Sequence, residues 1–225
     1  FLKDNIYNVD ACLWIGDVGI TGINAVADIL AGNVNPSGSL VDTYCYDNYS
    51  SPAMANFTPM IYEGYTEELI PEKAKSYMVY QEGIYVGYKY YETRYEDTVM
   101  GTGNAGSYVY SDDVAFPFGY GLSYTSFTYS DMSVSNTNPK GNQTVQVSVN
   151  LKNSGNYDGA EVVQLYIRDL VGSITRPVKE LKGFQKVFLK KGESKKVTFN
   201  ITPEDLKFYN NALKYDWEEG EFDMM

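Results

Sequence analysis

The sequence predicts an α/β fragment followed by an all-β domain, with a tyrosine-rich segment connecting the two. Near the amino terminus, a continuous apolar run and closely spaced glycines precede a helical pattern of apolar residues. A polar, aromatic stretch follows over about residues 44–113. From Ser126 onward apolar and polar residues alternate with a period of two, which is typical of strands. These observations predict two domains, at residues 1–125 and 126–225.

The α/β part is expected to contain one strand–helix–strand unit. Residues 11–15 (ACLWI) form a continuous apolar run, as in a parallel strand that is buried on both faces. A helix is expected next, with Thr21 as its N-cap and Gly32 as its C-terminal stop. A turn at residues 35–38 then leads to a second short strand at 39–43. The apolar face of the helix would be formed by Ile23, Val26, Ala27 and Leu30.

One such unit cannot close a hydrophobic core, because a parallel sheet needs several strands and helices on both of its faces. We therefore expect an incomplete α/β sandwich layer, so that the chain is a fragment of a larger domain.

Tyrosine is concentrated in the connecting segment. Of the 22 tyrosines, 17 lie between Tyr44 and Tyr129. A tyrosine ring can stack on a sugar and its hydroxyl can bond sugar hydroxyls, but tyrosine also fills half-buried extended structure. We favour the structural interpretation for most of them. We expect the segment to cover a neighbouring surface, with 63–75 as a short helix or a loop.

The alternation in the last hundred residues predicts a β-sandwich of immunoglobulin or fibronectin type, without the Cys-Trp-Cys core of antibody domains. Turn signals at 140–142, 154–156 and 191–193 separate the expected strands, and residues 221–225 resemble a final strand that is cut short. The aromatic and glycine-rich residues 115–127 are expected to form an ordered junction ahead of the sandwich. The apolar positions of the alternation are Val145, Val147, Val149, Leu151, Val163, Leu165, Ile167, Val197, Phe199 and Ile201.

Composition excludes several function classes. A formal net charge of −11 and a pI near 4.5 argue against nucleic acid and anionic membranes as partners. The chain has no histidine, which removes Ser-His-Asp and Cys-His catalysis. With only Cys12 and Cys45 present, a zinc site is not expected, and both are interpreted as free thiols. No cofactor and no metal are predicted, and no run of eighteen apolar residues could span a membrane.

Two motifs are candidate chemical sites. Gly16, Gly19 and Gly22 lie between the expected strand and helix, but their spacing matches no nucleotide-binding motif and indicates a tight turn. Glu82 or Glu92 could act as a catalytic acid or base, since glycoside hydrolysis uses two carboxyl groups. The alternative is structural, with Glu82 accepting bonds from loop amides or pairing with Lys89 or Arg94. We favour the structural alternative, because nothing in the sequence pairs Glu82 with a second carboxylate.

Four motifs in order resemble glycoside hydrolase family 3, which includes β-glucosidases and β-xylosidases. They are residues 22–30 (GINAVADIL), 32–40 (GNVNPSGSL), 82–91 (EGIYVGYKYY) and 116–127 (FPFGYGLSYTSF). The resemblance covers essentially the whole chain. It implies the C-terminal part of the family's α/β sandwich domain, followed by its fibronectin type III-like domain.

The resemblance implies a retaining, exo-acting enzyme whose (β/α)8 barrel supplies a nucleophilic aspartate. The acid/base glutamate usually comes from a loop upstream of the strand matched by residues 11–15. Neither part is present in this sequence, so no catalytic, cofactor-binding or metal-binding residue is assigned. Where family members often have Gln and Glu in the following loop, this chain has Ile20 and Thr21. The tyrosine-rich insertion resembles a subgroup in which the barrel follows the fibronectin-like domain.

The expected function is therefore a scaffold and cleft wall within a β-glucosidase-like enzyme that acts on β-glycosides or oligosaccharides. The missing barrel would pack against this part, and the isolated chain would be inactive. The alternative is a non-catalytic carbohydrate-binding or adhesion module. The sequence assigns neither the sugar and its linkage, nor the compartment, nor the oligomeric state.

Overall fold

The computed structural model describes residues 9–63, 76–102 and 106–225, and divides into two compact units. The first unit comprises residues 1–36 and the second residues 37–225, and each is described by itself. Most of the expected helix or loop at 63–75 lies outside the described residues. Within the described residues, no helix is long and apolar enough to cross a membrane.

The first unit contains the helix α1 (Gly19–Leu30), as predicted. It begins two residues before Thr21, with Val18 at the N-cap, so the expected cap was wrong. Its end is as expected, because Gly32 has a positive φ of 75° and its N–H donates to the carbonyl of Ile29 at 3.1 Å. The amide of Asn33 also donates to the carbonyl of Asp28 at 2.9 Å, which completes a Schellman motif.

The two strands predicted beside this helix are not formed. Residues 11–15 are irregular and exposed, with 66% of Trp14 accessible. A parallel strand exists only when a neighbouring strand takes its hydrogen bonds, and the described residues contain none for this segment. Residues 39–43 are also irregular. Leu40 forms two backbone bonds of 2.8 Å with the junction, from its N–H to Tyr120 O and to its carbonyl from Gly119 N–H.

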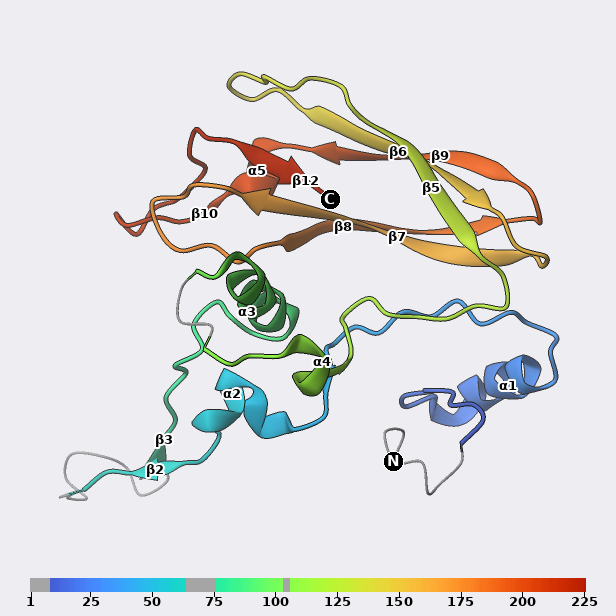
Figure 1. Ribbon diagram of the computed structural model, residues 1–225, viewed down its shortest axis with the longest axis horizontal. Helices are drawn as coiled ribbons and strands as arrows, with labels where there is room; N and C mark the ends of the chain where they lie inside the picture. The colour runs from blue at the N-terminus through green and yellow to red at the C-terminus, as the bar shows by residue number, and fades with distance from the viewer. Residues whose placement is uncertain (1–8, 64–75, 103–105) are drawn as a thin grey trace. The chain divides into compact units, whose positions relative to one another are not determined.

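The second unit begins with short elements and one substantial helix (Figure 1). β1 pairs antiparallel with β4, and β2 with β3. The tyrosine-rich segment was expected to be irregular, whereas it forms the 13-residue helix α3. The elements are β1 (Tyr44–Cys45), η2 (Asn48–Ser50), α2 (Pro52–Ala55), β2 (Met60–Ile61), β3 (Ser76–Tyr77), α3 (Tyr88–Met100), α4 (Tyr110–Asp113) and β4 (Val114–Phe116).

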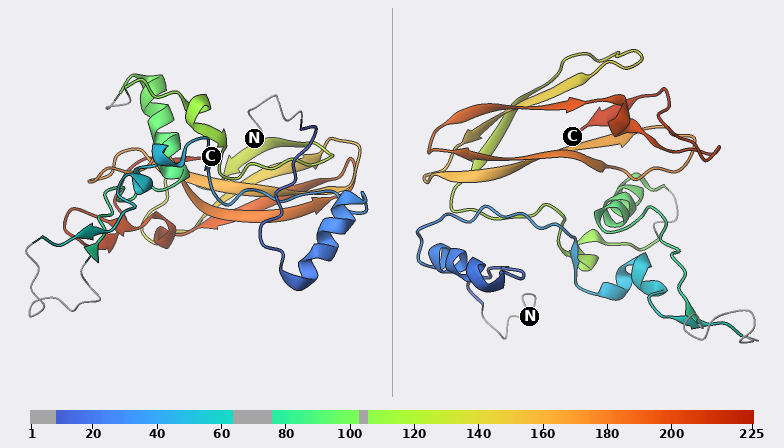
Figure 2. Two further views of the ribbon diagram at one scale, coloured as in Figure 1. Left: turned by 90° about the horizontal axis from the view of Figure 1, so that it is seen from below. Right: turned by 180° about the vertical axis from the view of Figure 1, so that it is seen from behind.

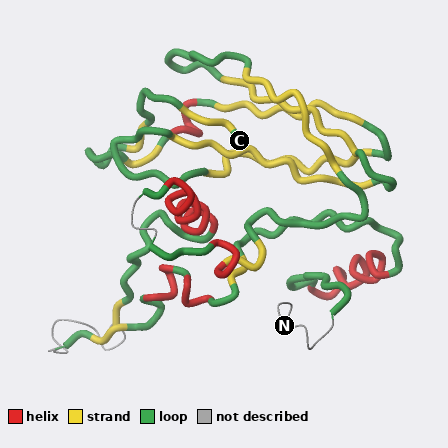
Figure 3. The backbone as a smooth tube through the Cα atoms, viewed as in Figure 1, coloured by secondary structure: helices red, strands yellow, loops and turns green. Residues whose placement is uncertain are grey.

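Two three-stranded antiparallel sheets form the sandwich, in the orders β5-β6-β9 and β12-β7-β8. Figure 2 shows them face to face in two further directions, and Figure 3 shows that most residues in strands belong to them. The predicted turns at 140–142, 154–156 and 191–193 all lie between consecutive strands. The strands are β5 (Phe127–Val134), β6 (Val145–Asn153), β7 (Gly159–Asp169), β8 (Glu180–Leu189), β9 (Ser194–Ile201) and β12 (Phe222–Met224).

The core of the sandwich follows the predicted alternation. Leu151 and Leu189 are fully buried, and Val197 keeps 2% of its surface exposed. Of the ten apolar positions of the alternation, Val149 and Phe199 are half-buried and the others are buried. A sheet with one buried face produces this pattern, because successive side chains point to opposite faces.

A short helix and a hairpin lie between β9 and β12. These elements are α5 (Pro203–Leu206), β10 (Phe208–Tyr209) and β11 (Tyr215–Asp216). Thr202 and Asp205 form a capping box at the start of α5. The final strand expected at residues 221–225 is present as β12, which pairs with the end of β7.

Gly121 in the junction supports a direct prediction. A Cβ at this position would lie 2.2 Å from the carbonyl oxygen of Gly38, so Gly121→Ala must separate the two backbones. We expect a loss of about 1–3 kcal/mol in the free energy of unfolding, as for other overpacked sites. Urea unfolding followed by circular dichroism measures it. Gly38→Ala is the matched control, because nothing lies within 4 Å of its Cβ position, and an equal effect of both variants would contradict the prediction.

Candidate functional site: the helix–sandwich junction

The charged side chains of α3 meet the sandwich along one face of the helix. Glycines bound this helix, with Gly87 at the N-cap (φ 57°) and Gly101 at the C-cap (φ 66°). Lys89, Glu92 and Glu96 are spaced by three and four residues, so they share a face. Each forms an ion pair with a residue of β7, of β8 or of the loop between them. We call this set the charged clamp: Lys89, Glu92, Glu96, Arg168, Arg176, Lys179, Glu180 and Lys182.

Glu180, the first residue of β8, joins four members of the clamp. Its carboxylate bonds Lys89 Nζ at 3.0 Å and lies 3.5 Å from Lys182 Nζ, and it also pairs with Arg176. Its side chain is only 19% exposed. Burial raises the pKa of this carboxyl, but Lys182, Lys89 and Arg176 outweigh that effect and hold the pKa below its usual value. Glu180 is therefore a stable anion in the folded protein.

Glu92 has one partner in the sandwich and one in α4. Its Oε2 lies 3.0 Å from Lys179 Nζ, and its Oε1 accepts a hydrogen bond of 2.7 Å from the Tyr110 hydroxyl. Burial, and then the bond to Glu92, raises the pKa of Tyr110. The phenol therefore stays protonated and keeps donating.

Neutral hydrogen bonds hold α3 in the same orientation. The Thr93 hydroxyl accepts from the amide of Val178 at 3.0 Å, and the Tyr88 hydroxyl accepts from the amide of Leu181 at 2.9 Å. The Tyr88 ring also lies 4.7 Å from the ring of Phe118. The prediction that the tyrosine-rich segment covers a neighbouring surface is therefore confirmed for α3.

On its other side α3 contributes to a small tyrosine core. Tyr91, Tyr108 and Val114 are buried together, with Tyr91 only 2% exposed. The Tyr108 hydroxyl donates to the Tyr91 carbonyl at 3.3 Å, and the Tyr91 hydroxyl bonds Ser50 Oγ at 2.9 Å. Burial raises the pKa of both phenols above the usual value. These tyrosines are structural, as the sequence predicted for most of that segment.

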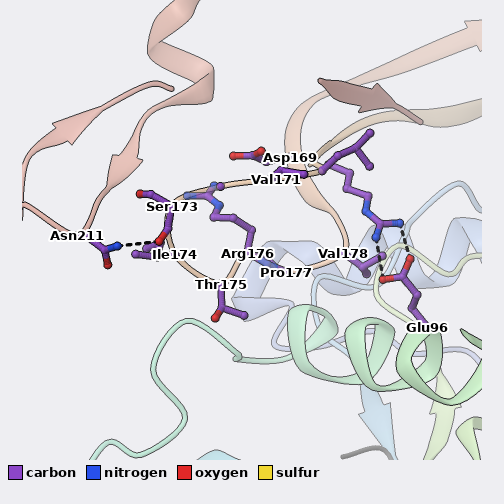
Figure 4. Close-up of a pocket in the computed structure, with 13 residues that line it drawn as sticks. Glu96, Asp169, Val171, Ser173, Ile174, Thr175, Arg176, Pro177, Val178 and Asn211 are labelled. Carbon is purple, nitrogen blue, oxygen red and sulfur yellow. Dashed lines mark hydrogen bonds and ion pairs between the residues drawn. The ribbon is translucent and has the colours of Figure 1, made fainter. Parts of the chain in front are cut away.

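Beside the clamp lies a hollow of about 680 Å³, shown in Figure 4. Arg168 bonds Glu96 at one wall, with Nη2 to Oε2 at 3.1 Å, and Asn211 donates to the Ser173 carbonyl at the other at 2.8 Å. Burial raises the pKa of Asp169, which also lines the hollow. The lining residues are Glu96, residues 168–178 and Asn211.

The chemistry of the hollow does not match a glycosidase centre. Retaining hydrolysis needs a carboxylate that is free to attack and a second carboxyl group that gives up a proton. Asp169 has the raised pKa that suits a proton donor. The Glu96 carboxylate in the same wall is occupied by the Arg168 guanidinium. The geometry thus describes a domain junction.

The structure gives different roles to the two carboxylates that the sequence offers as catalytic candidates. Glu92 belongs to the clamp. Glu82 lies in a turn before α3, where its backbone carbonyl accepts from the amide of Tyr85 at 3.0 Å. Lys89 was one of two partners expected for Glu82, but it bonds Glu180 instead, because the helix directs it to the sandwich. Among the described residues, no cluster could hold a metal ion.

Sequence reasoning missed the sandwich half of the clamp. Arg168, Lys179 and Glu180 were not singled out, since isolated charges at strand ends are usually solvated. Their only signal is the dense alternation of charge at residues 176–182 (RPVKELK). That pattern does not reveal which distant helix lies opposite.

Comparisons with known proteins match both parts of the chain. The glycosyl hydrolase family 3 C-terminal domain matches residues 2–88, and the fibronectin type III-like domain matches residues 161–225. Thermostable beta-glucosidase B of Acetivibrio thermocellus is 41% identical over 88% of this chain and 22% of its own length. The periplasmic beta-glucosidase of Salmonella typhimurium is 37% identical over 96% of this chain and 24% of its own length.

A solved structure agrees with these matches. The structure of beta-glucosidase 3B from Thermotoga neapolitana in complex with alpha-D-glucose is similar with a TM-score of 0.69 and 36% identity. The similarity covers 91% of this chain and 24% of that one. The chain thus spans about a quarter of the length of these relatives.

The order of the two matched domains, joined here through α3, defines the class as multidomain glycoside hydrolases. Within that class the chain belongs to glycosyl hydrolase family 3, of which it comprises C-terminal domain sequence and the fibronectin type III-like sandwich.

Proposed function

We propose that this chain is the scaffold part of a retaining, exo-acting β-glycosidase that hydrolyses O-glycosidic bonds. The observation that carries the proposal is the ordered match of both domains to relatives named as beta-glucosidases. In the whole protein, a (β/α)8 barrel packing against this part would supply the nucleophile. A β-glycoside or oligosaccharide would be the substrate.

The charges of the junction support a scaffold role. Glu92, Glu96 and Glu180 each bind a lysine or arginine of the sandwich or of α3. A general acid needs a raised pKa at neutral pH, whereas the pKa of Glu180 is lowered. These carboxylates therefore hold the two parts together and do not transfer protons. The aromatic side chains of the tyrosine-rich segment would add a cleft wall.

Assays of the isolated chain on aryl β-glucosides test the proposal. We expect no turnover above the uncatalysed rate, because the chain contributes neither of the two catalytic carboxyl groups. Glu82→Gln is the informative variant, since the sequence offers Glu82 as a candidate acid or base. Clear turnover by the chain that Glu82→Gln abolishes would overturn the scaffold assignment.

A non-catalytic carbohydrate-binding or adhesion module is the second candidate. Exposed aromatic rings favour it, including Tyr209 (65% exposed) and Tyr215 (54%), whose centroids lie 5.1 Å apart. Titration of the chain with soluble sugars distinguishes the two functions. Saturable binding without the rest of the enzyme would support the module, whereas a scaffold part gives no saturation.

A further inference from the structure

One end of the sandwich carries a concentrated positive charge. The turn between β8 and β9 and the adjoining strand residues hold five lysines and one glutamate within residues 186–196. The whole chain has only 18 lysines and arginines against 29 acidic residues, so this concentration departs strongly from the average. All five lysine side chains are exposed: Lys186, Lys190, Lys191, Lys195 and Lys196.

None of these five lysines forms an ion pair with a described residue. Two large apolar side chains accompany them on β8, where Phe184 is 68% exposed and Phe188 is 62% exposed. Phe184, Lys186 and Phe188 alternate with the buried Val187 and Leu189, so they share the outer face of the strand. We call this surface, Phe184 to Lys196, the basic end.

The segment at the opposite end of the same sandwich is acidic. Residues 216–223 (DWEEGEFD) contain five acidic residues and no basic residue. Exposed aromatic rings adjoin them, with Tyr215 54% and Trp217 37% exposed. We call this segment, together with Tyr215, the acidic end.

Strand register places the two ends far apart. Leu189 of β8 lies opposite Gly159 of β7, and Glu180 lies opposite Ile167. β12 pairs with residues 167–169 and therefore lies at the Glu180 end. Nine residue steps along β8 separate the ends by about 30 Å. In Figure 1 the turn between β8 and β9 lies at the right of the sandwich, with β10 and β12 towards the left.

We propose that the basic end of one copy binds the acidic end of a second copy, in a head-to-tail contact. Each surface combines exposed aromatic side chains with charge of one sign, and the two signs are complementary. Aromatic anchors within a charged surround are the composition of protein interfaces. The two surfaces differ, so the contact is heterologous and leaves a free end of each kind on every dimer.

Neither edge protection nor polyanion binding accounts for the basic end as well. Lysines protect exposed edge strands from pairing, and both β8 and β9 are edges of their sheets. Edge protection leaves the exposure of Phe184 and Phe188 without a reason, because these rings would increase the risk of aggregation. A long polyanion would be repelled by the rest of a chain with a net charge of −11. The acidic end of a second copy meets only the basic end at close range.

Sedimentation velocity of the full chain tests the contact directly. Exposed charges are screened within about 10 Å at 0.1 M salt and within about 3 Å at 1 M. We expect the weight-average sedimentation coefficient to rise with protein concentration at low salt, and to fall to the monomer value at high salt. A chain that stays monomeric at low salt across the concentrations of the experiment would overturn the proposal.

Two charge-reversal variants and their mixture test the head-to-tail geometry. K190E/K191E makes the basic end acidic, and E219K/E221K makes the acidic end basic. Each variant alone should dissociate at least about tenfold more readily, because like charges now oppose each other. Mixed in equal amounts they should associate again, since the intact acidic end of the first variant meets the intact basic end of the second. A mixture that stays dissociated would contradict this geometry.

A third variant controls for net charge. K140E/K214E changes the net charge by as much as K190E/K191E, but it leaves the basic end intact. We expect it to associate like the wild type. If it dissociated as readily as K190E/K191E, total charge would govern the behaviour and the proposed contact would be wrong. Circular dichroism spectra that match the wild type establish that each variant is folded.

Discussion

Replacing Asn153 with alanine is expected to lower the free energy of unfolding by about 3–4 kcal/mol, because four hydrogen bonds depend on this fully buried side chain. Its amide nitrogen donates to the carbonyls of Tyr157 at 2.8 Å and Leu189 at 3.1 Å. Its oxygen accepts from Thr125 Oγ1 at 2.7 Å and from the amide of Gly155 at 3.2 Å. Alanine would leave these partners unsatisfied and add a cavity.

Urea unfolding followed by far-UV circular dichroism measures this loss. Asn142→Ala is the matched control, since Asn142 is exposed in the turn between β5 and β6 and should change stability by less than about 0.5 kcal/mol. A loss below about 1 kcal/mol for Asn153→Ala would show that the buried network contributes little.

Asn153 also fixes the junction to the sandwich. Thr125 belongs to the junction, and its hydroxyl reaches across to the end of β6. The amides of Ser154 and Gly155 both donate to the carbonyl of Ser126, at 2.8 and 3.1 Å. A Cβ on Gly155 would lie 2.2 Å from Thr125 Oγ1, so the backbones approach as closely as glycine permits. The aromatic junction is thereby an ordered connection, as residues 115–127 predicted.

The sandwich could be predicted from sequence because its signal is local. Val145, Val147 and Leu151 alternate with polar residues, and a sheet with one buried face makes that alternation necessary. The turns are marked by glycine and asparagine at fixed places between the strands. Each of these signals depends on neighbours in the chain, and the structure confirms each one.

The helix α3 could not be predicted in the same way. Its sequence, YKYYETRYEDTVM, is rich in tyrosine and threonine, which are weak helix formers, and lacks a continuous apolar stripe. Its stabilising face is charged, and the partners lie about 70–95 residues further along the chain. Only the folded sandwich brings Arg168, Lys179 and Glu180 opposite it, so no local pattern encodes the clamp.

The α/β layer fails for a third reason. Residues 11–15 have the composition of a buried strand, yet a strand needs an adjacent strand to bond. The apolar face of α1 is similarly unpaired, with Leu30 74% exposed and none of the helix residues buried. The helix forms because its hydrogen bonds are internal, whereas the strand depends on chain that the described residues do not include.

Replacing Glu180 with glutamine is expected to cost about 2–3 kcal/mol at pH 7, the second large effect. The change removes the anion shared by Lys89, Arg176 and Lys182 and leaves three cations facing one another. Breaking a fully buried pair costs about 3–5 kcal/mol, and the 19% exposure of Glu180 reduces this figure. Glu204→Gln is the control, because Glu204 pairs with Lys207 at 72% exposure and should have little effect.

The pH dependence of that difference tests its electrostatic origin. The folded-state pKa of Glu180 lies below its ordinary value of 4.5, so folding favours the ionised form. The stabilisation is therefore complete above about pH 4.5 and is lost as the pH falls through the folded-state pKa. Glutamine mimics the protonated carboxyl, so the stability difference between wild type and Glu180→Gln should shrink from pH 7 to pH 3. A difference that stays constant over this range would assign the effect to packing, and the charged clamp would then not be what holds α3 on the sandwich.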